Sequence, residues 1–74
     1  MAMAYVILNA EIGFENDVLK ALKDIPEVKE SFKVYGVYDI IIRVEADTVD
    51  ELKELVSEIR QMQKVRATLM MIVI

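Results

Sequence analysis

The sequence contains no cysteine and no histidine, and it has only one proline and two glycines among 74 residues. Without cysteine the chain has no disulfide, no thiolate metal ligand and no cysteine nucleophile. Without histidine it lacks the commonest general base and the commonest metal ligand. No serine or threonine therefore has a histidine to activate it, and the sequence predicts no catalytic residue, no metal site and no cofactor.

The charge balance is acidic, with nine basic residues, thirteen acidic residues and a net charge of −4. The basic residues are scattered, whereas a nucleic-acid-binding protein usually presents a basic stripe. We therefore expect no direct binding of DNA or RNA. The apolar N-terminal residues lack the basic flank of a signal peptide and are soon interrupted by Asn9 and Glu11. These features predict no membrane span and a cytoplasmic location.

The chain is long enough for only one domain, over residues 1–74. A domain of this size buries only about 60% of the surface of its unfolded chain, so its stability is marginal. Disulfides, metals or self-association usually compensate, and the first is excluded. Hydrophobic residues make up 55% of the chain, and two short helices cannot cover that many apolar side chains. We therefore expect self-association, at least as a dimer.

Apolar patterning predicts the element order βαββαβ, with strands over residues 4–11, 28–35, 40–46 and 65–74. The first helix follows Gly13 and is stopped by Pro26, and the second begins at Thr48, which forms a capping box with Glu51. This order predicts a ferredoxin-like α+β fold, in which two helices cover one face of a four-stranded antiparallel sheet. The other face is apolar, and a second copy of the chain would cover it.

Three details of packing follow from the same patterning. Val28 and Phe32 are expected on one face of a partly wet edge strand, and the β-branched run from Ile40 is expected to be a central strand. The second helix is expected to bury six apolar side chains, namely Val49, Leu52, Leu55, Val56, Ile59 and Met62.

The glycine turn between the second and third predicted strands is the most informative stretch. Gly36 stands where a turn needs a residue that tolerates positive φ, and Tyr38 and Asp39 follow at the mouth of the next strand. On spacing alone the turn is an ordinary hairpin, in which Asp39 bonds local backbone and Tyr38 covers an edge.

Three segments together resemble a known family: Val34-Tyr35-Gly36-Val37-Tyr38-Asp39, Ile25-Pro26-Glu27-Val28 and Val65-Arg66-Ala67-Thr68. They resemble the ligand-sensing RAM domain of the Lrp/AsnC feast/famine transcription regulators, over nearly the whole chain. The resemblance implies dimers packed sheet face on sheet face, assembly into octamers or similar rings, and an amino-acid effector bound between subunits. It suggests a co-regulator of full-length family members. Since the first strand starts by Ala4, we expect no helix-turn-helix domain.

The resemblance implies a ligand-binding role for Gly36, Tyr38 and Asp39 in the turn. Thr68 matches the first of two polar family positions on the last strand, and Met70 replaces the second, a departure from the family pattern. Positions 68 and 70 share one face of a strand. Asp39 can accept hydrogen bonds from an ammonium, and amides near Gly36 can donate to a carboxylate. For Thr68, ordinary strand propensity is an equally good explanation.

Two other functions remain open at this stage. The first is a purely structural assembly module with a decayed site, for which Met70 is the main evidence. The second is a small dimeric α+β barrel enzyme, which has the same strand order. The lack of histidine, and of any basic residue on the central strands apart from Arg43, counts against an enzyme.

Overall fold

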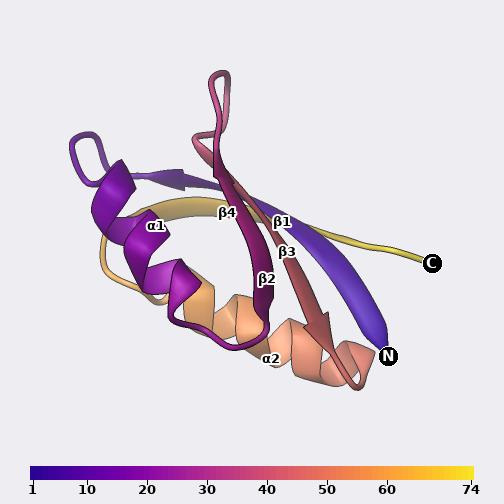
Figure 1. The fold of residues 1–74 in the computed structure, drawn as a ribbon. Coiled ribbons are helices and arrows are strands. Elements are labelled where there is room, and N and C mark those ends of the chain that lie inside the picture. The colour runs from indigo at the N-terminus through magenta and orange to yellow at the C-terminus, as the bar shows by residue number, and fades with distance from the viewer.

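The computed structural model describes residues 1–74 as one antiparallel sheet with both helices on the same face (Figure 1). Along the chain the elements are β1 (Ala2–Ala10), α1 (Glu15–Lys23), β2 (Val28–Lys33), β3 (Ile40–Ala46), α2 (Val49–Arg60) and β4 (Val65–Ile72). The order of the strands in the sheet is β2-β3-β1-β4. The predicted ferredoxin-like fold is confirmed, with β2 at an edge and β3 in a central position.

The core lies between the helices and one face of the sheet. Alternation along β1 directs Val6 and Leu8 toward the helices and Tyr5 and Ile7 away from them. Neither edge strand contributes a fully buried side chain. Every buried residue is hydrophobic, and the set is Ala4, Val6, Leu8, Ala10, Val18, Leu22, Ile40, Ile42, Val44, Leu52, Leu55, Val56 and Ile59.

The opposite face of the sheet carries no helix, and we call it the open face. Ile7 lies opposite Ile41 on one side and Leu69 on the other, and Phe32 lies opposite Ile41. Phe32 is 52% exposed, and Leu69 and Met71 are 45% and 46% exposed. Exposed apolar side chains on neighbouring strands mark an interaction site.

One charged cluster interrupts the open face. Arg43 donates hydrogen bonds to the carboxylates of Glu30 and Glu45 and to the sulfur of Met3. The hydrogen bond to Glu30, and then the one to Glu45, raises the pKa of Arg43 above its usual value. The guanidinium, which is charged at physiological pH in any case, thus places a charge on a largely apolar surface.

The structure corrects the expected packing of the second strand. The pairing register shifts between Val28 and Glu30, and such a bulge reverses the direction of the side chains that follow. Val28 pairs with Val44 and packs against the core, whereas Phe32 lies on the open face. The prediction that Val28 and Phe32 share one face is therefore wrong. The strand also ends at Lys33 rather than at residue 35.

The second helix follows the prediction at its start and departs from it at both ends of its apolar stripe. The Thr48 hydroxyl accepts a hydrogen bond from the amide of Glu51 at 3.2 Å, which confirms Thr48 as the N-cap. The Glu51 carboxylate accepts no hydrogen bond in return, so only half of the predicted capping box forms. Four of the six predicted side chains are buried. Val49 is 40% exposed, because it occupies the first helical position, and Met62 lies beyond the end of the helix at Arg60 and is only half-buried.

Candidate functional site

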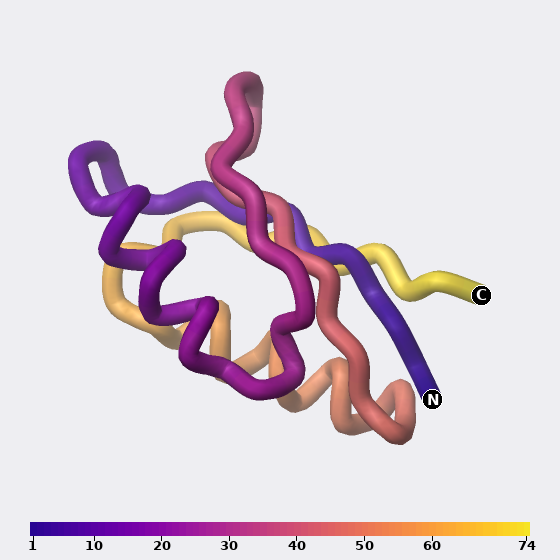
Figure 2. The backbone as a smooth tube through the Cα atoms, viewed as in Figure 1, coloured from indigo at the N-terminus to yellow at the C-terminus, as the bar shows by residue number.

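The connection between β2 and β3, residues 34–39, projects from the body of the molecule and is called the hairpin here (Figure 2). Gly36 has a φ of +136°, which confirms the predicted need for a glycine. A Cβ at this position would meet no atom within 4 Å. Within one chain, glycine is therefore required by the backbone conformation and not by crowding. Tyr35 and Val37 beside it are exposed, although both are apolar over most of their surface.

Asp39 fixes the base of the hairpin to β1. Its Oδ2 atom accepts a hydrogen bond from the amide of Ala10 at 3.2 Å, and its own amide donates to the carbonyl of Leu8 at 3.1 Å. Its carbonyl accepts from the amide of Val34 at 2.8 Å. Asp39 thus bonds a distant strand as well as its own turn. The second carboxylate oxygen, Oδ1, has no partner in the chain and can accept from a ligand.

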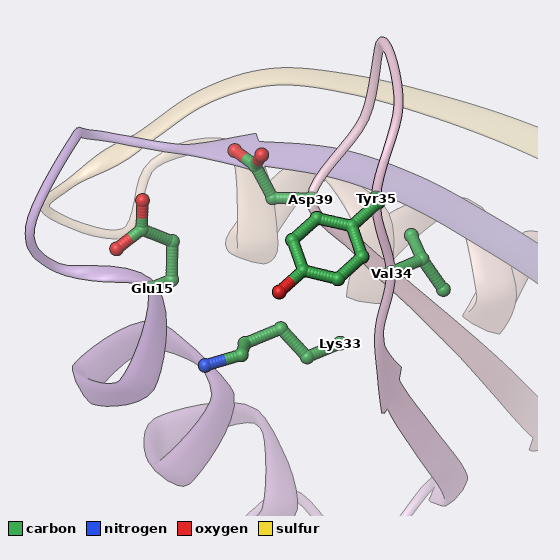
Figure 3. A pocket seen from close by; sticks show the side chains of 5 residues that line it. All are labelled: Glu15, Lys33, Val34, Tyr35 and Asp39. Carbon is green, nitrogen blue, oxygen red and sulfur yellow. The ribbon is translucent and has the colours of Figure 1, made fainter.

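A hollow of about 240 Å³ lies beside Asp39 (Figure 3). Its charged and polar lining comes from Glu15 at the start of α1, from Lys33 at the end of β2 and from Tyr35 and Asp39 in the hairpin, with Val34 completing it. In Figure 3 the hydroxyl of Tyr35 and the ammonium of Lys33 point into the space below Asp39, on the side of Glu15. Two carboxylates, one ammonium and one phenol can together bind a molecule that carries both charges.

Local hydrogen bonds hold two of these side chains in place. The amide of Gly13 donates to Oε1 of Glu15 at 3.1 Å, and Nζ of Lys33 donates to Oδ1 of Asn16 at 3.0 Å. Sequence reasoning missed Glu15, Lys33 and Tyr35 as lining residues. Glu15 and Lys33 are brought together by the packing of α1 beside β2, for which the sequence carries no local signal.

The two predicted residues on β4 lie elsewhere in the chain. Thr68 pairs with Leu8 and Met70 with Val6, so they share a face as predicted, and it is the face that the helices cover. Met70 packs against the core, and the Thr68 hydroxyl accepts a hydrogen bond from Nε of Arg60 at 2.7 Å. Neither residue lines the hollow beside Asp39.

The five residues predicted to bind ligand therefore do not meet in a single chain. Gly36, Tyr38 and Asp39 belong to the connection between β2 and β3, and β1 separates β3 from β4. Tyr38 is half-buried and Gly36 is exposed, and neither contacts the hollow. No group of three or more carboxylates is arranged to hold a metal ion, and neither helix has the length and apolar character needed to span a bilayer.

Comparison with curated proteins finds homocitrate synthases. The chain is 39% identical over 57 residues to the homocitrate synthase of Sulfurisphaera tokodaii and 34% identical over 61 residues to that of Saccharolobus solfataricus. These matches cover 77% and 82% of the chain. The chain spans only 12% and 13% of the length of the two synthases, so the similarity concerns one segment of each enzyme.

Solved structures share the fold over the whole chain. FFRP-DM1 superposes with a TM-score of 0.97 at 40% identity, with complete coverage of both chains. A hypothetical protein from Pyrococcus horikoshii, PHS023, gives a TM-score of 0.93 at 40% identity and covers 100% of this chain and 90% of its own. Escherichia coli AsnC shares the fold with a TM-score of 0.89 at 23% identity, over 99% of this chain and 50% of AsnC.

The family model described as the Lrp/AsnC ligand binding domain matches residues 4–74. This range takes in all of the elements except the first two residues of β1, together with the hairpin and the hollow beside Asp39. The match agrees with the resemblance drawn from the sequence. The chain belongs to the Lrp/AsnC ligand-binding domain family.

Proposed function

We propose that the chain is a non-enzymatic sensor of amino acids that works as an assembly of identical copies. The observation that carries the proposal is the half-satisfied carboxylate of Asp39 at the edge of a charged hollow. An amino acid presents an ammonium and a carboxylate on one carbon. A carboxylate with one free oxygen, beside a lysine and a tyrosine hydroxyl, is complementary to such a ligand.

Assembly follows from the open face. Phe32, Leu69 and Met71 are about half exposed on a surface that no element of the chain covers. A second copy, related by a two-fold axis, would bury both open faces at once. A homodimer packed face to face is the proposed building block, and octamers or similar rings are proposed from family membership alone.

The effector site is proposed to lie where two copies meet outside the contact between open faces, because Thr68 and Met70 are on the face that the helices cover. Gly36, Tyr38 and Asp39 come from the hairpin of one copy, and Thr68 and Met70 come from β4 of its neighbour. Because β1 separates the two groups within one chain, a neighbouring copy is the simplest way to join them. The hollow beside Asp39 supplies further polar groups to the same site.

Two settings for this sensor are supported by different observations. Family membership supports a co-regulator that joins full-length Lrp/AsnC regulators. The similarity to a segment of homocitrate synthases supports a second role, in which the same kind of domain binds an effector that regulates a metabolic enzyme. A gel shift with a full-length family regulator separates them. The co-regulator role predicts that the chain changes the shift given by the regulator and produces none alone.

Calorimetry with each of the twenty L-amino acids tests the sensing function. We expect at least one amino acid to bind wild-type protein, and we expect Asp39→Asn to weaken that binding. If no amino acid binds at millimolar concentration to the wild type or to Met70→Thr, while both remain assembled, the sensor proposal fails. The chain is then a structural assembly module.

A further inference from the structure

Arg60, the last residue of α2, is held by a hydroxyl rather than by a carboxylate. Its Nε atom donates to Oγ1 of Thr68 at 2.7 Å. It takes part in none of the three ion pairs of the chain. The chain has thirteen acidic residues and nine basic ones, so an ordered arginine without a carboxylate partner is unexpected.

Two other cations are engaged by carboxylates, whereas Lys29 and Lys33, like Arg60, bond only to neutral oxygens. The guanidinium of Arg43 donates to Glu30 and Glu45, and Nζ of Lys64 lies 3.8 Å from a carboxylate oxygen of Glu11. A guanidinium has five N–H donors. Arg60 uses only the one on Nε, which leaves the donors of both Nη atoms free in a side chain whose position Thr68 fixes.

The same hydrogen bond determines what Thr68 can do. A threonine hydroxyl has one donor and can also accept. Since Oγ1 of Thr68 accepts from Arg60, its O–H is free to donate in another direction. Arg60 and Thr68 together therefore present N–H and O–H donors, which suit an anionic oxygen. Asp39, in contrast, presents only an acceptor.

We infer that Arg60 is a specificity-determining residue that binds the carboxylate of the effector, with Thr68 as its positioning partner. The inference rests on the proposed sensing function and assigns the two ends of the ligand. The carboxylate is bound by Arg60 and Thr68 of one copy, and the ammonium by Asp39 of its neighbour. The planar fork of an arginine can bind both oxygens of a carboxylate, so the site selects a free amino acid over its amide.

A simpler role for Arg60, stabilising the end of α2, has to be distinguished from ligand binding. A cation in the last turn of a helix interacts favourably with the C-terminal carbonyls, and Arg60 is the basic residue in that turn of α2. A lysine at position 60 would keep this interaction but would lose the fork and the Nε donor. Arg60→Lys therefore separates a role in helix stability from a role in binding.

The test uses calorimetry with the tightest-binding L-amino acid and with the amide of the same amino acid. Arg60→Met should weaken binding of the free acid by about 10- to 100-fold and leave binding of the amide unchanged. Arg60→Lys should keep the wild-type melting temperature without restoring full binding of the acid. Lys53→Met, which removes another exposed cation of α2, should change neither affinity.

Three results would overturn the inference. If Arg60→Met weakens the acid and the amide equally, or weakens neither, Arg60 does not bind the carboxylate and only this assignment fails. If the wild type binds acid and amide equally well, no cation selects the carboxylate. If the wild type binds no amino acid at all, the sensing function fails and the assignment fails with it.

Discussion

Asp39 illustrates how one residue can serve both the fold and the site. One carboxylate oxygen and the backbone tie the hairpin to β1, and the other oxygen, which has no partner in the chain, is proposed to accept from a ligand. Asp39→Asn keeps an oxygen that can accept from the amide of Ala10, so the fold should persist. The variant loses the negative charge, and binding of an amino acid should weaken by about 10- to 100-fold.

Calorimetry measures this effect, and Asp47→Asn, at an exposed aspartate, provides the matched control. Equal affinity of the wild type and Asp39→Asn would remove Asp39 from the site. If Asp39→Asn lowers the melting temperature but binds the amino acid as tightly as the wild type, Asp39 has a purely structural role.

Lys64 is the only residue other than glycine with a positive φ, at +73°. A side chain in this conformation costs about 1–2 kcal/mol. The strain is offset by contacts of the side chain, since Nζ lies 4.3 Å from the centre of the Phe14 ring and 3.8 Å from a carboxylate oxygen of Glu11. The carbonyl of Lys64 also accepts from the amide of Glu11 at 2.7 Å.

Two substitutions at Lys64 distinguish the energetic cost of its strained backbone from the stabilisation by its side-chain contacts. Lys64→Ala loses the side-chain contacts and keeps the strained backbone, whereas Lys64→Gly loses the same contacts and relieves the strain. We predict that Lys64→Gly is more stable than Lys64→Ala by about 1 kcal/mol. Urea denaturation measures both values, and an alanine variant as stable as the glycine variant would contradict this reading.

At the scale of elements, the sequence predicts β3 to the residue, because its β-branched run has no competing interpretation. The face reversal in β2 was missed, since a bulge between Val28 and Glu30 leaves no mark in the apolar pattern. Of the five residues predicted to bind ligand, only Asp39 lines the hollow. Asp39 could be found from the glycine turn, whereas Lys33 and Arg60 acquire their partners only through tertiary packing.

Met70 on the edge strand β4 packs against the core, and it is also one of the residues proposed to bind the effector. This side chain lies opposite Val6 and packs against the core, so Met70→Thr should lower the free energy of unfolding by about 1–2 kcal/mol. The added hydroxyl lies on the same face as that of Thr68, and binding of polar amino acids should become tighter. Assembly should not change.

Thermal melting and calorimetry on Met70→Thr check both effects, with Met70→Leu as a control that keeps an apolar side chain. Unchanged stability would show that Met70 does not pack in solution as the structure has it. Weaker binding of polar amino acids would show that position 70 lies outside the site.

At the scale of the whole molecule, the open face should determine the oligomeric state. Leu69 is 45% exposed on this face and lies opposite Ile7. Leu69→Lys would place an unpaired charge in an apolar interface, where its desolvation is costly. We predict that this variant sediments as a monomer at micromolar concentration. Ser57→Lys adds the same charge on the exposed side of α2 and should leave the assembly intact.

The central claim is that an amino acid binds between copies of this chain. Native mass spectrometry with and without a pool of the twenty L-amino acids tests it most directly, because the spectrum reports stoichiometry and bound mass together. We predict dimers or larger assemblies that gain the mass of an amino acid when the pool is present. Only the 8.5 kDa monomer, or assemblies that gain no mass at millimolar amino acid, would contradict the claim.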